Sequence, residues 1–370
     1  MMTQETIGMT GLVAVSPAAS SEPRASGRGA RVTLADVRAL LRLGRLKFLP
    51  YSAVLYALGV TVAVHRGIPI ELGPYLHGQL FVWCVHLMTH YCNEYFDLEA
   101  DRKNLAPTPM TGGSRVLVEG LLSPSVSLGA AFVLLFVSFG LLSAMPSAGA
   151  RAIGCAMIAL AWFYTAPPFR LNYRGLGEVS VSLVLNVTVP LLGLRLQGGA
   201  LSASVALVLL PGAVIQVIRM MIMNLMDHDG DVAAGKATLA TFFGRERVKD
   251  VYLAGHAVAY GLPILFMGRG FPAAAVILLA LTAPLSAWQG LRLRRGEGRD
   301  VRTAGSIAFW ASTHVALVVV ATSLGLVLDR LRGSAGEPDG SLILCAAIPL
   351  VFLVSIIPQL LRNRRLLCAG

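Results

Sequence analysis

Ten runs of mainly apolar residues, separated by short polar segments, follow one another along the chain. A helix needs roughly 20 such residues to cross the hydrocarbon core of a bilayer, and each run approaches that length. Because backbone groups in lipid must be hydrogen-bonded internally, the pattern predicts helices, and the alternation typical of membrane barrels is absent. The runs occupy residues 47–65, 77–96, 126–144, 149–166, 178–196, 204–226, 249–267, 272–290, 306–328 and 341–361.

The predicted fold is therefore an all-α polytopic membrane protein, a bundle of nine to ten transmembrane helices with a central cavity open to the cytoplasmic side. Just before the first run, residues 33–46 place Leu34, Val37 and Leu40 on one helical face beside a basic face, with Thr33 as a possible N-cap. This pattern predicts an interfacial helix. Residues 1–32 are rich in Ser, Ala, Gly and Pro, which predicts a disordered tail, whereas 329–370 predict one extra helix and a basic tail.

Composition supports a membrane protein, since 55% of the residues are hydrophobic and only 14% are charged. The basic residues then predict the orientation. With the N-terminus inside, 22 Lys and Arg lie in cytoplasmic segments and six lie in outer turns or span edges. By the positive-inside rule, both termini are predicted to be cytoplasmic. The net charge of +11 is explained by contact with anionic lipid, without nucleic acid.

Four carboxylates follow the second apolar run, in the stretch NEYFDLEAD at residues 93–101. On a helix, Asn93, Asp97 and Asp101 are spaced i, i+4 and i+8, which predicts a slowly turning stripe about 12 Å long. A solvated helix end would explain one or two acids in this position.

A second motif, NLMDHDGD at residues 224–231, also ends an apolar run on the predicted inner side. Asn224, Asp227 and Asp231 are spaced i, i+3 and i+7, which places them on one helical face. Two such stripes at one depth are unexpected for simple helix ends, and acids at a helix C-terminus oppose the helix dipole. Oxygen ligands of this kind predict Mg²⁺, which commonly bridges carboxylates and phosphate.

Basic residues follow both motifs and complete the predicted site. A ring of cations together with Mg²⁺ would neutralise a diphosphate, whereas the glycine-rich motifs of common nucleotide sites are absent. The candidate residues near the two motifs are Arg102, Lys103, Arg115, Tyr164, Arg170, Tyr173, Arg174 and Lys236.

These residues resemble the UbiA superfamily of intramembrane prenyltransferases. The two acidic motifs match the aspartate-rich motifs of that superfamily, and Gly235, Lys236 and Thr238 match the GK-T element that follows the second. The pieces GGSRVLVEGLLS and YRGLGEV most resemble the branch that prenylates 1,4-dihydroxy-2-naphthoate in menaquinone synthesis. The resemblance covers about 45–328, so residues 33–328 are the expected prenyltransferase domain. Glu94 stands where Asp is common, a change expected to have little effect.

The resemblance implies an enzyme that takes an allylic prenyl diphosphate as donor and an aromatic acceptor. Mg²⁺ would be held by Asn93, Asp97, Asp101, Asn224, Asp227 and Asp231. The expected catalytic residues are Asp97, Asp101, Asp227, Asp231, Arg115 and Lys236. Direct diphosphate contact is expected from Arg102, Lys103, Arg115, Arg170, Arg174 and Lys236. Tyr164 is a candidate to shield an allylic carbocation through its π face.

Arg219 is a charge well inside an apolar run, eight residues and so about 12 Å before Asp227. An arginine in this position usually faces a cavity or a partner. It is either part of the acceptor pocket, together with Gln216, or a brace between helices, and the sequence leaves both interpretations open.

Two other functions fit parts of the pattern. A secondary transporter could also have buried acids, but transporter sites tend to lie near mid-membrane on broken helices, whereas these acids lie at the ends of apolar runs. A membrane-bound terpene cyclase on the same scaffold would use the same Mg²⁺ site. The acceptor, the prenyl length and the oligomeric state are not predicted by the sequence.

Overall fold

In a computed structural model of the chain, residues 33–104, 113–298, 300–333 and 339–362 are described. The predicted tail at 1–32 and the end of the chain lie outside these residues. Within them, all regular elements are helical. They are α1 Leu34–Leu43, η1 Leu46–Phe48, α2 Leu49–His65, α3 Leu72–Phe96, α4 Leu98–Lys103, α5 Pro124–Ser143, α6 Ala148–Trp162, η2 Leu171–Tyr173, α7 Gly177–Ser182, η3 Leu183–Thr188, α8 Val189–Leu196, α9 Ala203–Met226, α10 His228–Ala233, α11 Leu239–Leu265, α12 Ala273–Ala280, α13 Ala283–Arg294, α14 Val301–Gly333 and α15 Gly340–Arg362.

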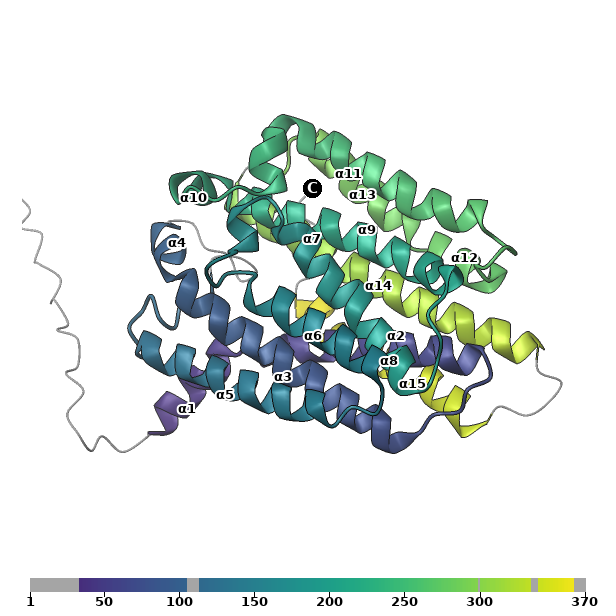
Figure 1. Cartoon of the computed structure of the whole chain (residues 1–370). Helices are drawn as coiled ribbons and strands as arrows, with labels where there is room; N and C mark the ends of the chain where they lie inside the picture. The colour runs from purple at the N-terminus through teal and green to yellow at the C-terminus, as the bar shows by residue number, and fades with distance from the viewer. Residues whose placement is uncertain (1–32, 105–112, 299, 334–338, 363–370) are drawn as a thin grey trace, which may run out of the picture.

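The long helices run side by side as a bundle, and each coincides with one of the ten predicted runs (Figure 1). Within the described residues, seven helical stretches are long and apolar enough to cross a membrane: Leu46–His65, Pro124–Ser143, Gly177–Leu196, Ala203–Met226, Ala273–Arg294, Thr303–Gly333 and Gly340–Leu361. Among the remaining long helices, α3 and α11 contain more polar residues, and α6 has only 15 residues. The protein is thus a multi-pass helical membrane protein, while the count of nine to ten crossings stays a prediction.

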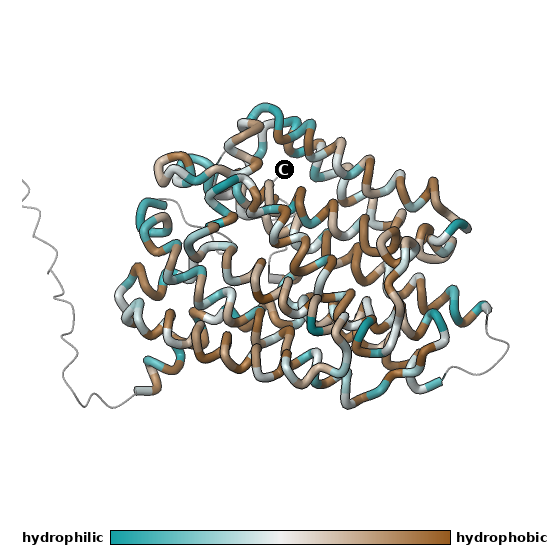
Figure 2. Tube along the Cα trace, in the orientation of Figure 1, coloured by the Kyte–Doolittle hydropathy of each residue, from teal (hydrophilic) through white to brown (hydrophobic). Residues whose placement is uncertain are grey.

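Hydropathy differs between the ends and the middle of the bundle. Polar residues gather at the end that contains α4 and α10, and apolar residues dominate between the two ends (Figure 2). Among the candidate spans, α5 and α15 are the least buried, at 22% each, and they expose apolar side chains such as Phe136 and Val351. Exposed apolar rings and branched side chains on a span are expected to face lipid, so these two helices lie on the outside of the bundle.

The interior of the bundle is closely packed. Helix α2 packs on α8, α3 on α5, α9 on α11, and α12 on α14. The contact between α2 and α8 depends on Gly59, because a Cβ atom at this position would lie only 1.7 Å from the Pro190 carbonyl oxygen. Small residues allow helix backbones to approach closely in membranes, where packing replaces the hydrophobic effect as the driving force.

The helix predicted at residues 33–46 is observed as α1, whereas its interfacial position stays a prediction. The Thr33 hydroxyl accepts a hydrogen bond from the Asp36 backbone N–H, and the Asp36 carboxylate accepts one from the Thr33 N–H. This reciprocal capping satisfies two backbone donors at the start of the helix. Leu43 is fully buried and Tyr91 Oη donates to the Leu40 carbonyl, so α1 is fixed against α3.

Candidate active site

A cavity of about 270 Å³ lies inside the bundle, and its two ends differ in chemistry. The polar end contains Asn93, Asp97, Asp101, Asn224, Asp227 and Lys236. The remainder of the wall is mainly apolar, from α3, α6, η3 and α9, and includes Val82, Val85, Met157, Leu160, Val184, Leu185 and Met223. Such a cavity suits a molecule with an anionic head and an apolar body.

Both acidic motifs have the same local structure, a short break between two helices at the central aspartate. Helix α3 ends at Phe96 and α4 begins at Leu98, so Asp97 stands at a break, with φ −94° and ψ 2°. Asp227 stands at an equivalent break between α9 and α10, with φ −95° and ψ 6°. Backbone hydrogen bonds from Asp97 to Asn93 and from Asp101 to Asp97 continue across the first break. Each motif therefore contains a helix break at its central aspartate, where ψ lies outside the helical range.

The two motifs meet at the polar end of the cavity. Helices α4 and α10 pack against each other, and Asn104 Nδ2, just after α4, donates to Asp227 Oδ1 at 2.9 Å. Between the motifs lies Lys236, whose Nζ is 3.8 Å from Asp97 Oδ2 and 3.7 Å from Asp231 Oδ1. A single buried cation thus contacts one carboxylate from each motif.

The loops on either side hold Lys236 and the acids in position. The Lys236 N–H donates to the Asp231 carbonyl, and the neighbouring Ala237 pairs with the segment around Tyr173. From that segment, Asn172 Nδ2 donates to the Asp97 carboxylate at 3.2 Å. The predicted GK-T element and the YRGLGEV segment, which are more than 50 residues apart, are therefore parts of one structure around the acidic motifs.

The donor set fits Mg²⁺. The motif side chains offer only oxygen or amide ligands, and Asp231 Oδ2 is a buried oxygen with no hydrogen-bond partner. Among the described residues, no three His, Cys, Asp or Glu side chains form a ready-made metal cluster. This arrangement is compatible with Mg²⁺, which keeps water ligands and is commonly bound by one or two carboxylates together with substrate phosphates.

Burial raises the pKa of the last aspartate of each motif, Asp101 and Asp231. Burial and then the charge of Asp97 raise the pKa of Asp101 to about 7. Burial raises the pKa of Asp231 to about 7 as well, with Lys236 opposing the shift and Asp227 adding to it. Burial alone would lower the pKa of Lys236, but Asp97 and Asp231 more than reverse this, so its pKa lies above the ordinary value. Without metal, the site therefore holds protons near neutral pH.

These raised carboxyl pKa values predict how the stability of the metal-free protein depends on pH. The folded state binds protons that the unfolded state releases near pH 4, so this stabilisation is complete below that pH and is lost as pH rises through about 7. We expect the melting temperature of the chelator-treated protein to fall between pH 5.5 and 8. The variant Asp101→Asn/Asp231→Asn should show a flatter profile in the same scan. A melting temperature that rises over this interval would contradict the assignment.

The other predicted basic residues lie in different places. Arg115 Nη1 donates to the Asp101 carbonyl at 2.5 Å, so it supports the first motif through its backbone. Arg170 stacks over the Tyr173 ring at 3.9 Å. Arg102, Lys103 and Arg174 are exposed and do not line the cavity, and Lys103 pairs with Glu99. Lys236 is therefore the predicted cation that the structure brings closest to both motifs.

Two buried glutamates were not predicted as functional. Glu94, only 3% exposed, accepts hydrogen bonds from Arg45 and from the Ser114 N–H and hydroxyl. It connects the start of α2 with the loop after the first motif, so its identity matters to the structure. That loop also contains Gly113, at φ +77°, where a Cβ atom would lie 2.2 Å from Asp101 Oδ2. An aspartate at position 94 has a shorter side chain and would reach Arg45 and Ser114 less easily than Glu94 does.

The second glutamate, Glu178, is fully buried. Its Oε1 accepts hydrogen bonds from Asn224 Nδ2 at 2.7 Å and from the Leu239 N–H at 2.8 Å. It thus orients the asparagine of the second motif and fixes the start of α11. In the first motif, Asn93 is oriented differently, because its Oδ1 accepts a hydrogen bond from Thr165 at 2.8 Å. In the sequence, Glu178 lies in the YRGLGEV segment, which indicated a family resemblance but gave Glu178 no role of its own.

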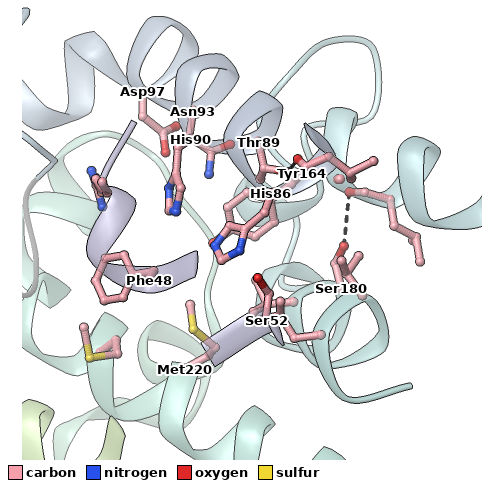
Figure 3. A pocket seen from close by; sticks show the side chains of 18 of the residues that line it. Phe48, Ser52, His86, Thr89, His90, Asn93, Asp97, Tyr164, Ser180 and Met220 are labelled. Carbon is pink, nitrogen blue, oxygen red and sulfur yellow. Dashed lines mark hydrogen bonds between the residues drawn. The ribbon is translucent and has the colours of Figure 1, made fainter. Parts of the chain in front are cut away.

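Two histidines of α3 were also missed. His86 and His90 line the cavity below Asn93 and Asp97, and all four side chains project from one face of α3 (Figure 3). The spacing i, i+4, i+7, i+11 of these residues is the signal that could have shown this.

Arg219 lines the cavity, whereas Gln216 is buried beside it, with its Oε1 3.5 Å from Tyr51 Oη. Tyr164 lines the same cavity as the first motif (Figure 3), and its role near a reacting centre stays a prediction.

A helical bundle in which two Asn/Asp motifs meet at the polar end of an otherwise apolar cavity defines a multi-pass membrane protein with an acidic site. The chain belongs to the UbiA prenyltransferase family, whose sequence pattern matches residues 52–313. The protein is therefore a prenyltransferase by family, with homologues that are named as such.

Similar proteins include several that act on naphthoates by name. A 1,4-dihydroxy-2-naphthoate octaprenyltransferase of Bacillus subtilis is 23% identical over 256 residues, which cover 68% of this chain and 81% of the relative. The same-named protein of Mycobacterium tuberculosis is 30% identical over 220 residues, or 57% of this chain and 72% of the relative. A 2-carboxy-1,4-naphthoquinone phytyltransferase of Arabidopsis thaliana is 26% identical, but the match spans only 62% of its length.

Solved structures show the same fold. A UbiA homologue from Aeropyrum pernix without ligand has a TM-score of 0.60, with 19% identity, 77% of this chain and 98% of the other covered. A UbiA homologue from Archaeoglobus fulgidus bound to GPP and Mg²⁺ has a TM-score of 0.52, with 16% identity, 77% and 99% covered. At these identities the likeness concerns the arrangement of helices.

Proposed function

We propose that the protein transfers a prenyl chain, in the presence of Mg²⁺, from an allylic prenyl diphosphate to an aromatic acceptor of naphthoate or benzoate type. The product would belong to quinone or related lipid biosynthesis. The observation that carries this proposal is the placement of two Asn/Asp motifs around Lys236 at the polar end of an otherwise apolar cavity. The names of the relatives, and the ligands of the A. fulgidus homologue, support it.

The chain's own residues would promote departure of the diphosphate. Mg²⁺ would be held by Asn93, Asp97, Asp101, Asn224, Asp227 and Asp231, where it supplies positive charge to the diphosphate. Lys236 adds a buried cation beside both motifs. When the donor carbon–oxygen bond breaks, its electron pair goes to the diphosphate and an allylic carbocation remains. Preorganised positive charge at the leaving oxygen stabilises this transition state more than the ground state.

The rest of the cavity would protect the carbocation and hold the tail. The apolar wall from α3, α6 and η3 excludes water and contacts the isoprene units. Aromatic rings near the polar end, Tyr164 and Phe48, offer π faces to the cation (Figure 3). An electron-rich ring carbon of the acceptor then bonds to the cation, and loss of a proton or carboxyl group restores aromaticity.

The alternatives predict different products. A terpene cyclase on this scaffold would ionise the same donor but use an internal double bond as the nucleophile. A secondary transporter is less well supported, because the acidic motifs lie at helix ends rather than near mid-span. Membranes containing the protein should be incubated with labelled geranylgeranyl diphosphate and Mg²⁺, with and without 1,4-dihydroxy-2-naphthoate. Prenylated aromatic product supports the proposal, whereas a cyclic hydrocarbon or an unchanged donor contradicts it.

The orientation can be tested independently. The bias of basic residues predicts that the polar end of the cavity and both termini face the cytoplasm. A reporter enzyme fused after Gly370 should be active only inside the cell, and a reporter fused before Met1 should behave in the same way. If the C-terminal reporter is active only outside, the number of crossings is odd, and α15 or another helix does not span.

A further inference from the structure

Arg219 is a cation inside the cavity that neither acidic motif neutralises. It projects from α9, eight residues and so about 12 Å before Asp227. Its Nε donates to Ser312 Oγ at 3.0 Å, and its Nη1 lies 3.2 Å from the Met220 sulfur, a weak acceptor. Among the described residues, Arg219 forms no ion pair with a carboxylate. A half-buried charge without a counter-ion is costly within a membrane-spanning helix, so a ligand with negative charge is expected there.

Buried polar atoms without partners occur in the same cavity as Arg219 or on the same helix. His86 Nδ1 and His90 Nε2 are buried on the cavity side of α3 and have no hydrogen-bond partner. Gln216 Nε2, one turn before Arg219, is also buried and unpartnered. Figure 3 shows the two imidazoles below Asn93 and Asp97, with Met220 of α9 across the cavity. Buried polar atoms nearly always have partners, so several of them around one cavity indicate a polar ligand.

These groups form a second polar layer, separate from the acidic motifs. Tyr51 and Tyr164 line the same cavity as Arg219, and Tyr51 also contacts Gln216. The layer is rich in donors and contains one fixed positive charge, whereas the outer layer contains four aspartates. A single ligand cannot satisfy both layers with the same group. The diphosphate suits the outer layer, and a smaller anionic group suits the inner one.

We propose that Arg219, with His86 and Gln216, binds an acidic substituent of the aromatic acceptor, most simply a ring carboxylate. This assignment rests on the proposed function and deepens it, because it names an acidic aromatic compound as the acceptor class. The separation of about 12 Å along α9 leaves room for the acceptor ring between the two layers. With its acidic group on Arg219, the ring is directed towards the donor carbon next to the diphosphate. Arg219 is then a specificity-determining residue.

The competing interpretation is that Arg219 only braces α9 against α14 through Ser312. Removing Ser312 would disturb that brace and leave the charge in the cavity. The variants Arg219→Gln, Arg219→Lys and Ser312→Ala therefore separate recognition from bracing. Each should be assayed with geranylgeranyl diphosphate and two acceptors that differ in one group, 1,4-dihydroxy-2-naphthoate and 1,4-dihydroxynaphthalene.

With Arg219→Gln, the KM for the naphthoate should rise about 10- to 100-fold, as expected when a hydrogen bond to a charged group is lost. The KM for 1,4-dihydroxynaphthalene and for the donor should stay within about twofold of the normal values, because the first lacks the carboxylate and the diphosphate of the second is held at the acidic motifs. Arg219→Lys should recover part of the preference for the naphthoate, and Ser312→Ala should keep it. The preference of the wild-type protein for the acid should be lost only with the positive charge.

Equal losses with both acceptors, or the same losses in Ser312→Ala, would overturn the assignment in favour of bracing. Naphthoate binding, measured by calorimetry with Mg²⁺ and inorganic diphosphate, keeps the test independent of turnover. If the wild-type protein binds the naphthoate no better than Arg219→Gln, the inner site does not exist. The wild-type protein could instead convert the donor to a cyclic hydrocarbon and still bind the naphthoate more tightly than Arg219→Gln does. In that case the proposed transferase function fails while the anion site remains.

Discussion

Replacing either Asp97 or Asp227 with asparagine is expected to reduce turnover by about 10²- to 10³-fold, the loss seen when one preorganised electrostatic contact to a developing charge is removed. The two residues stand at matching helix breaks, one in each motif, and both line the polar end of the cavity. Asparagine keeps the shape and one acceptor oxygen, so the hydrogen bonds from Asn172 and Asn104 can persist. The expected loss is therefore catalytic.

The double variant should be scarcely less active than either single variant. If both motifs act on one diphosphate, removing either carboxylate already destroys the arrangement, and residues that act as a unit are far from additive. Turnover of the four proteins in a double-mutant cycle measures this. Multiplicative losses would show that the motifs work independently, and near-normal activity of either single variant would show that its motif is only a polar helix end.

The chain offers a matched control in the second motif. Asp229 lies two residues after Asp227, but its side chain is 84% exposed and contacts His228 and Arg245 outside the cavity. Asp229→Asn should therefore retain nearly full activity. Melting temperatures without ligand complete the control, because relief of charge repulsion should leave Asp97→Asn and Asp227→Asn as stable as the wild type or slightly more stable.

Removal of divalent metal should abolish turnover. Without metal, Asp97, Asp101, Asp227 and Asp231 would repel a diphosphate, and Lys236 alone cannot offset them. Activity should vanish in EDTA and return with excess Mg²⁺ or Mn²⁺. Donor binding should weaken in the same samples, which separates loss of the site from loss of chemistry alone. Full turnover in EDTA would refute the metal assignment for this protein.

Much of the fold follows from local properties of the sequence. Apolar runs long enough for a membrane coincide with the helices, because in lipid the backbone must satisfy its own hydrogen bonds. The cap at Thr33 could also be predicted, because capping involves residues only three positions apart in the sequence. The number of crossings depends on α3, α6 and α11, whose polar residues or length blur the hydropathy signal.

The acidic motifs were predicted because their ligands are spaced within single segments. The helix breaks at Asp97 and Asp227 were not predicted, since both segments have helical spacing and no proline or glycine at the break. The basic residues near the motifs in the sequence only partly predicted which cations lie at the site. Sequence proximity favoured Arg102 and Lys103, yet these side chains point to solvent, whereas Lys236 reaches both motifs.

The sequence by itself determined the membrane class, the positions of the helices, and the two motifs that supply oxygen ligands. Each of these is encoded by residues within one helix length of one another. Only the tertiary structure decided that Lys236 lies between the motifs, that Glu178 orients Asn224, and that His86 and Arg219 share one cavity. Apart from the contact between Lys236 and Asp231, these relations join residues between 46 and 139 positions apart. Helix packing sets them, and no local periodicity records which faces will meet.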